Sequence, residues 1–125
     1  MIQPVSIDHV CLLVTSLSRA AAYYKRVFDF TCTIRPNDPQ TLMVESSDVH
    51  FFISEVSDIS TDFLRQQHLS LAVDDLDHVI AILEELGISD YETGEFKMFQ
   101  HRNHTWCEWR DPDGIRLECV ERTSP

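Results

Sequence analysis

The sequence predicts an α+β fold built from two similar modules, each with the order strand, helix, strand, strand, strand. The first observation is an internal repeat, because the stretch HVCLLVTSL that begins at His9 returns as HLSLAVDDL at His68. The second is that a segment with helical spacing of apolar residues follows each copy, and the third is that short strand-like runs follow each helix. One such module is too small to bury its own apolar face, so both are expected to pack in a single domain spanning residues 1–125.

The first module covers about residues 5–55. Its opening stretch, HVCLLV, is rich in strand-forming residues and predicts a strand. The stretch TSLSRAAAYYKRVFDF predicts a helix, because Tyr24, Val27 and Phe28 recur at helical spacing and a serine at position 16 or 18 can cap its start. Three strands are then expected over TCTIR, TLMVES and VHFFISE, separated by PNDPQ and SSD.

A linker over residues 56–67 joins the modules, and the second module covers about residues 68–122. HLSLAV predicts a strand, and LDHVIAILEELG predicts an amphipathic helix that an aspartate at position 75 or 77 caps and Gly87 ends. Four strand-like runs follow, ISDYET, KMFQHR, TWCEWR and IRLECVE. DPDG separates the last two, and its Pro and Gly are typical of a type I turn, which predicts a hairpin.

The composition excludes several classes of function. Asp and Glu number 21 against 10 Lys and Arg, a formal net charge of −11, which argues against a nucleic-acid partner and an anionic membrane surface. We find no apolar run of membrane-spanning length and no signal-peptide pattern at the start. The four cysteines form no C-x-x-C pair, so we expect reduced thiols in a cytoplasmic protein.

Strand alternation places candidate metal ligands away from the predicted core. If Val10, Leu12 and Val14 pack on the first helix, His9 and Cys11 face the other way. The same alternation leaves His68 on the non-core face of its strand. It packs Ile115, Leu117 and Cys119 into the core and leaves Glu118 facing away. Two imidazoles with one carboxylate are a common donor set for a divalent metal. The alternative for each residue alone is a hydrogen-bonded histidine or a solvated glutamate. The repeat favours the metal site, because it puts the two histidines at equivalent points.

Three motifs together resemble the vicinal oxygen chelate superfamily, which includes glyoxalase I, bleomycin-resistance proteins, fosfomycin thiol transferases and extradiol dioxygenases. They are IDHVCLLVTSL with YYKRVF, HLSLAVDDLD, and DPDGIRLE, and the resemblance extends from Ile7 to about Glu121. It implies paired βαβββ modules whose curled sheets enclose a cup. It also implies divalent-metal ligands at His9, His68 and Glu118, with the metal one of Mn, Fe, Zn, Ni or Mg.

The same resemblance implies a fourth ligand from VHFFIS, where alternation packs Phe51 and Ile53 on the helix and leaves His50 and Phe52 facing the cup. Phe52 is the equivalent of Glu118 and cannot bind a metal. In glyoxalase I and in methylmalonyl-CoA epimerase, another member of the superfamily, a carboxylate or amide is usual at this position. The departure leaves the two-histidine, one-carboxylate set of the fosfomycin thiol transferases and extradiol dioxygenases. His50 is then a base beside the metal, an alternative ligand or a residue lining the cup. Cys11 is either a reactive thiol near the metal or a small buried apolar residue.

The stretch FKMFQHRNHTWCEWR is dense in functional groups. We expect His104 or Glu108, like His50, to transfer protons, and Arg102 and Trp106, like Cys11 and Phe52, to contact the substrate. The alternative is a hydrophilic hairpin with two core tryptophans. Glu108 replaces a tyrosine of the fosfomycin thiol transferases, which argues against that activity.

Two functions follow from these observations. The first is a metal-dependent enzyme acting on a small oxygen-bearing molecule as a lyase or isomerase, a thiol transferase or a dioxygenase. The second is a non-catalytic drug- or metabolite-binding protein of the bleomycin-resistance type, for which the net charge of −11 suits a cationic ligand. We expect a homodimer in either case.

Overall fold

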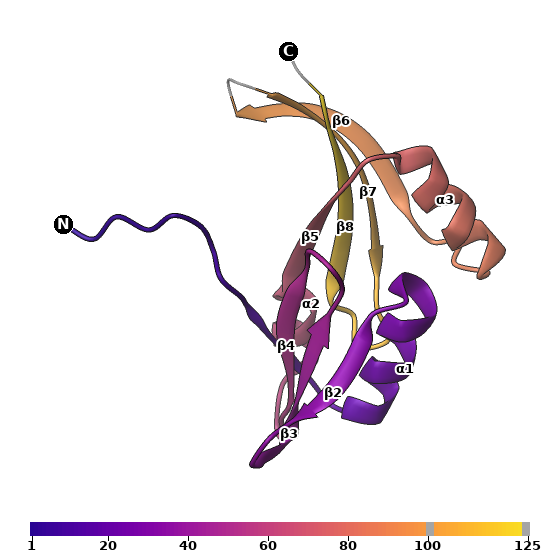
Figure 1. Cartoon of the computed structure of the whole chain (residues 1–125). Coiled ribbons are helices and arrows are strands. Elements are labelled where there is room, and N and C mark those ends of the chain that lie inside the picture. Colours follow the sequence, from indigo (N-terminus) through magenta and orange to yellow (C-terminus); the bar gives the residue numbers. More distant parts are fainter. Residues whose placement is uncertain (100–101, 124–125) are drawn as a thin grey trace. The chain divides into compact units, whose positions relative to one another are not determined.

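The computed structural model describes residues 1–99 and 102–123 and divides the chain into two compact units, Met1–Ser60 and Thr61–Pro125. Each unit contains one βαβββ module with a four-stranded sheet, so the predicted α+β fold of two similar modules is confirmed (Figure 1). No helix within the described residues is long and apolar enough to cross a membrane.

The first unit forms a mixed sheet in the order β1-β4-β3-β2, with β1 parallel to β4 and the other pairs antiparallel. Helix α1 contacts β2, β3 and β4. The elements are β1 (Cys11–Val14), α1 (Leu17–Phe28), β2 (Thr31–Arg35), β3 (Asp38–Glu45) and β4 (His50–Glu55).

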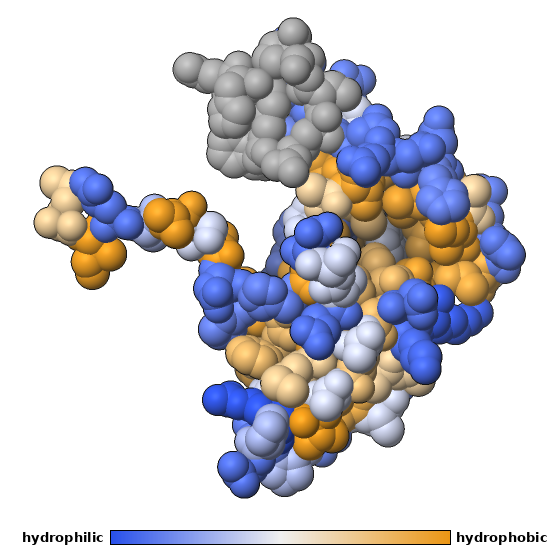
Figure 2. Space-filling model, in the orientation of Figure 1, coloured by the Kyte–Doolittle hydropathy of each residue, from blue (hydrophilic) through white to orange (hydrophobic). Residues whose placement is uncertain are grey.

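Strand β1 begins at Cys11, whereas the sequence predicted a start at His9. Its partner β4 begins at His50, but the parallel register starts only at the Cys11–Phe52 pair, and the bond nearest the N-terminus joins the Phe52 amide to the Val10 carbonyl at 2.9 Å. Val10 is therefore 41% exposed, which corrects its predicted place in the core. The residues before Val10 extend away from the sheet of their unit (Figure 1), and both apolar and polar side chains are exposed along them (Figure 2).

The core of the first unit follows the predicted alternation at most positions. Leu12 and Val14 from β1 and Phe51 and Ile53 from β4 are buried together with Tyr24 from α1. Helix α1 begins where the Ser16 hydroxyl accepts from the Arg19 amide at 3.3 Å, and it ends at Asp29, which adopts the left-handed conformation.

The second unit repeats this arrangement with the sheet order β5-β8-β7-β6, in which β5 is parallel to β8 and the other pairs are antiparallel. Its elements are α2 (Thr61–Gln66), β5 (His68–Val73), α3 (Leu76–Glu85), β6 (Glu92–Phe99), β7 (Arg102–Arg110) and β8 (Arg116–Thr123). Helix α2 lies in the segment predicted as a linker, which the sequence analysis missed because the helix buries a single apolar side chain, Leu64.

The predicted strand over ISDYET is wrong in its first half. The amides of Gly87 and Ile88 donate to the carbonyls of Glu84 and Leu83 at 3.0 and 2.8 Å, which closes the end of α3 in a Schellman-type motif with Gly87 at φ 78°. The Ile88 amide is therefore bonded to the end of α3 and not to a neighbouring strand, and β6 begins only at Glu92.

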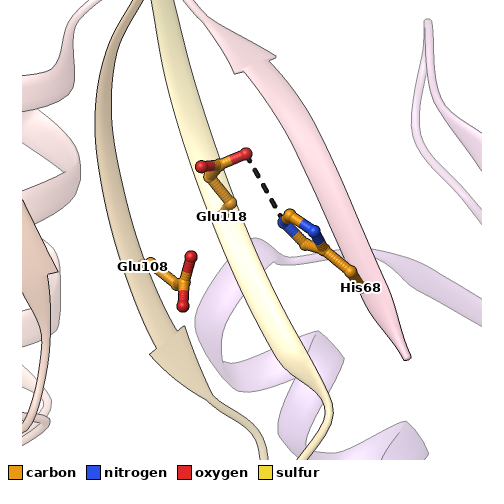
Figure 3. A group of neighbouring side chains, drawn as sticks. All are labelled: His68, Glu108 and Glu118. Atoms are coloured by element: carbon orange, nitrogen blue, oxygen red, sulfur yellow. Dashed lines mark ion pairs between the residues drawn. The ribbon is translucent and has the colours of Figure 1, made fainter. Parts of the chain in front are cut away.

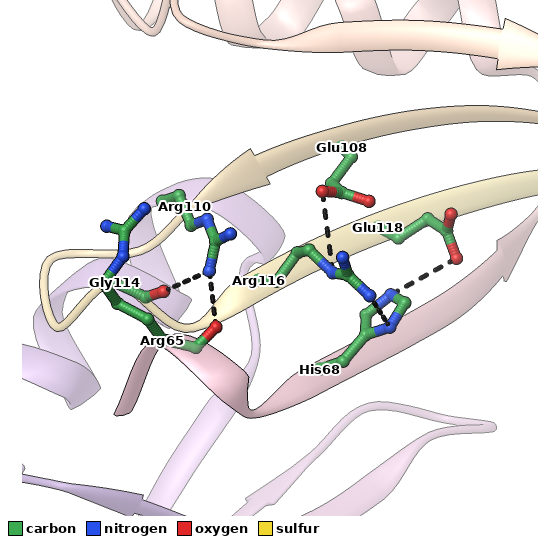
Figure 4. Close-up of polar contacts among 7 residues, drawn as sticks. All are labelled: Arg65, His68, Glu108, Arg110, Gly114, Arg116 and Glu118. Carbon is green, nitrogen blue, oxygen red and sulfur yellow. Dashed lines mark hydrogen bonds and ion pairs between the residues drawn. The ribbon is translucent and has the colours of Figure 1, made fainter. Parts of the chain in front are cut away.

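The DPDG turn forms as predicted and fixes where β8 begins. The Gly114 amide donates to the Asp111 carbonyl at 2.9 Å, and the buried Asp111 carboxylate accepts from the amides of Asp113 and Ile115, both at 2.9 Å. The Arg110 guanidinium donates to the carbonyls of Arg65 and Gly114, which ties the turn to α2 (Figure 4).

Candidate metal site

The sheet of the second unit has one face under α3 and one face that carries functional groups. Ile115, Leu117 and Cys119 are buried, as alternation predicted, and α3 contacts β7 and β8. Cys107 lies directly across from Cys119, and burial raises the pKa of the two thiols to about 11 and about 12. The neighbours of these cysteines, Glu108 and Glu118, are therefore also cross-strand partners, and they face the opposite side of the sheet.

Glu118, Glu108 and His68 meet on that face and form what we call the His68 cluster (Figure 3). The His68 Nε2 atom is 3.5 Å from the Glu118 Oε1 atom, and one ligand atom from each of the three residues lies within 4.8 Å of the other two. The side chains of His68, Glu108 and Glu118 are 33%, 21% and 11% exposed, so the cluster is partly shielded yet open to a ligand.

Arg116 bridges two members of the His68 cluster (Figure 4). Its Nη2 atom is 2.9 Å from the His68 Nδ1 atom, and its Nε atom is 3.5 Å from the Glu108 Oε1 atom. A guanidinium only donates hydrogen bonds, so the His68 Nδ1 atom must accept. The proton of the neutral imidazole then lies on Nε2, on the side of the Glu118 carboxylate.

The donor set fits a divalent cation. One imidazole and two carboxylates are ligands that Zn, Mn and Fe share, and ligands bound to one such ion at about 2.0–2.3 Å lie roughly 3–4 Å apart. The Nε2 to Oε1 separation of 3.5 Å between His68 and Glu118 is within that range. The ligand atom of Glu108 lies within 4.8 Å of those of the other two residues.

His9, the third predicted ligand, lies in the first unit, just before β1. Its Nδ1 atom is 2.6 Å from the Asp8 Oδ2 atom, and its half-exposed ring contacts the Phe52 ring edge-on at 4.7 Å between centroids. The hydrogen bond with His9, together with the charge of that ring, lowers the pKa of the Asp8 carboxyl. A metal-binding role for His9 stays a prediction that rests on the repeat.

The other predicted residues of the first unit lie on one face of its sheet. Cys11 and Phe52 are register partners, and the Arg35 guanidinium carbon lies 5.4 Å from the centroid of the Phe52 ring. The exposed Cys11 thiol is 3.4 Å from the Ser54 hydroxyl, and His50 is exposed at the start of β4.

Two of the predicted residues of β7, His104 and Trp106, share the face of Glu108. His104 is buried, at 6% exposure, and Trp106 is half-buried with its indole beside Gly94 on β6, its register partner. A β-carbon at Gly94 would lie 2.5 Å from the indole, so the ring occupies the space that glycine leaves. Arg102 is in β7, but its side chain lies outside the described residues.

Sequence reasoning missed the contact of Arg116 with the cluster and treated Glu108 only as a proton-transfer group. The DPDG turn would have allowed the positions of both Arg116 and Glu108 to be predicted. Counting outward from it pairs Arg110 with Arg116 and Glu108 with Glu118. Both carboxylates and the guanidinium therefore had to share one face.

The chain therefore consists of two similar modules, each with a mixed sheet and a helix that packs on it. The sheet of the second module carries the His68 cluster. The chain belongs to the Glyoxalase/Bleomycin resistance protein/Dioxygenase superfamily, whose family model matches residues 6–119. The predicted relationship is therefore confirmed. No curated protein matches the chain by sequence.

Several solved structures have the same fold. A virulence protein from Salmonella typhimurium superposes with a TM-score of 0.76 at 19% identity, covering 97% of this chain and 98% of that one. The bleomycin resistance determinant of transposon Tn5 gives 0.71 at 19% identity, covering 94% and 98%. The fosfomycin resistance protein FosX of Listeria monocytogenes, in complex with Mn(II) and sulfate, gives 0.64 at 15% identity, covering 97% and 93%. At these identities the similarity establishes the fold alone.

Proposed function

We propose that this protein is a divalent-metal-dependent enzyme that acts on a small oxygen-bearing molecule, with His68, Glu108 and Glu118 as metal ligands. The observation that carries the proposal is the convergence of these three ligand atoms within 4.8 Å on one sheet face. The Mn(II) complex of FosX supports it by showing that a protein with this fold holds a divalent ion. That His9 is a further ligand is a proposal that rests on the repeat alone.

A divalent ion bound there supplies Lewis acidity toward neighbouring oxygen atoms of a substrate. Glu108 is proposed as a ligand rather than as the proton-transfer group, because it lies across from Glu118 in the same cluster. Trp106 lies next to Glu108 on the same face, and its flat ring over Gly94 offers an apolar wall for substrate. His104 lies further along that face and remains the proposed proton-transfer group of this unit.

The finer assignments remain proposals of the same kind. Lyase or isomerase, thiol transfer and dioxygenase reactions all suit the donor set, and fold does not choose among them. Cys11 and Phe52, which share a sheet face, and Arg102 are proposed substrate contacts, and His50 is a proposed proton-transfer group. We also propose a cytoplasmic homodimer. The exposed apolar side chains of the N-terminal segment, at Ile2, Val5 and Ile7, support the self-association.

One observation favours the alternative of a non-catalytic binding protein. Arg116 already balances part of the cluster's negative charge, which a protein without a metal requires. On this alternative, the carboxylates and the Trp106 ring hold a cationic ligand directly, as the net charge of −11 suits.

The test is the metal content of the stripped and reloaded protein by elemental analysis. We expect about one divalent ion per chain in the wild type and little in His68→Ala or Glu118→Ala. His78→Ala and Glu85→Ala are matched controls, since both residues are exposed on α3, and these variants should keep the ion. Absence of uptake, or equal uptake by every variant, would contradict the enzyme and favour the binding protein.

A further inference from the structure

We propose that the Arg116 guanidinium is an internal competitor for the metal, which holds the metal-free His68 cluster together and must leave His68 when an ion binds. This inference rests on the proposed metal site, and it concerns how that site is loaded. It starts from the two contacts of one guanidinium, at 2.9 Å to the His68 Nδ1 atom and at 3.5 Å to the Glu108 Oε1 atom.

The ring of His68 makes the competition unavoidable. Arg116 uses the lone pair of Nδ1, so the ring proton lies on Nε2, and a protonated ring nitrogen cannot bind a metal. If the metal binds Nε2, the proton moves to Nδ1, where it faces an N–H donor of Arg116. If the metal binds Nδ1, it takes the lone pair that Arg116 uses. Either nitrogen therefore binds a metal only when Arg116 has withdrawn.

The ion pair of Arg116 with Glu108 and the positive charge of Arg116 also oppose metal binding. The Glu108 carboxylate is shared between an ion pair with Arg116 and a place in the donor set. A cation bound within the cluster would also be repelled by a guanidinium a few ångströms away. Arg116 has room to withdraw, because its side chain is 40% exposed and lies on a flexible stem.

Arg110, the register partner of Arg116, does not take over this role. Its guanidinium is held by the backbone carbonyls of Arg65 and Gly114 at 2.6 and 2.9 Å, away from the His68 cluster (Figure 4). The two arginines therefore have separate tasks: Arg110 fixes the turn, and Arg116 contacts the ligands.

The inference is tested by titrating the stripped protein with Mn²⁺ alone and with Zn²⁺ alone, with binding measured by calorimetry. We expect Arg116→Met to bind the metal about tenfold more tightly than the wild type, because the metal no longer has to break a charge-assisted hydrogen bond. Tenfold is at the low end of the effect of such a bond, since Arg116 is partly exposed. Arg116→Lys keeps the charge but not the planar fork and should fall between the two. Arg65→Met, which removes an arginine side chain outside the cluster, should bind like the wild type.

A second readout follows the ring itself. In ¹⁵N-resolved spectra of the histidine rings, the metal-free wild type should show His68 with its proton on Nε2, and metal loading should change that pattern. Wild-type binding with equal or weaker binding by Arg116→Met would overturn the competition and leave the proposed metal site standing. Binding by neither protein would overturn both, whereas binding by Arg116→Met alone would support both.

Discussion

The Gly94→Ala substitution tests the packing of the sheet face on which Trp106 lies. The added β-carbon would lie 2.5 Å from the Trp106 Cζ2 atom and 2.7 Å from Cε2, whereas carbon atoms in ordinary contact are about 3.5–4.0 Å apart. The indole must therefore move by about 1 Å or tilt off the strand. Overpacking of this size costs about 1–3 kcal/mol.

The backbone contribution has the opposite sign and is smaller. Gly94 is not in the left-handed region, so alanine there restricts the unfolded chain and stabilises the fold by about 0.4–1 kcal/mol. We expect a net loss of about 1–2 kcal/mol in the free energy of unfolding, measured by urea denaturation as a lower midpoint at unchanged slope.

A double-mutant cycle separates the two contributions. With Trp106→Ala as the background, the clash is gone, and Gly94→Ala should be neutral or slightly stabilising. The coupling energy should then be about 1–3 kcal/mol. An equal loss from Gly94→Ala in both backgrounds would refute the steric reasoning.

Three further outcomes are expected. Glu108→Gln should weaken metal binding about 10- to 100-fold in calorimetry, since it removes one of three clustered donors, whereas Glu85→Gln should not; equal affinities would remove Glu108 from the donor set. Asp111→Ala should lower the free energy of unfolding in urea by about 2–3 kcal/mol, because one buried and one partly buried amide lose their acceptor, and a loss below about 0.5 kcal/mol would contradict the structural role of this carboxylate. Cys107 and Cys119 should resist a thiol reagent at pH 8 in the folded protein, because burial raises their pKa values to about 11 and about 12 and little of the reactive thiolate forms below those values. The exposed Cys11 should react at once. Rapid reaction of all four thiols before unfolding would contradict this prediction.

Local patterns were enough to predict most of the fold. Alternation placed Leu12, Val14, Phe51 and Ile53 in the first core, and the same rule placed Leu117 in the second. These predictions hold because a half-buried strand has a fixed period of two. The DPDG turn was equally secure, since its geometry depends on residues within the turn.

The errors at Val10 and at Ile88 both concern the end of an element. Val10 reads as a core residue, but the paired register of β1 with β4 starts at Cys11 and leaves Val10 41% exposed. Ile88 reads as part of a strand, but its amide completes the end of α3. The start of β1 depends on pairing with β4, which lies far along the chain, whereas the end of α3 is local to Ile88 and is marked by Gly87.

The candidate site shows the same division. His68 and Glu118 were predicted from strand alternation and the repeat, because both lie on regular strands. Glu108 and Arg116 join them through cross-strand register, which becomes readable only by counting outward from the hairpin turn. Which ring nitrogen of His68 accepts from Arg116 depends on side-chain geometry, and the sequence carries no signal for that.

The most direct test of the proposed metal site is the position of a bound ion. Crystals grown or soaked with Mn²⁺ would locate the metal by its anomalous scattering. We expect a peak within about 2.3 Å of a His68 ring nitrogen and of carboxylate oxygens from Glu108 and Glu118, with the Arg116 guanidinium withdrawn from His68. A peak elsewhere would contradict the proposed ligand set, and Arg116 still bonded to His68 beside the ion would contradict the competition between them.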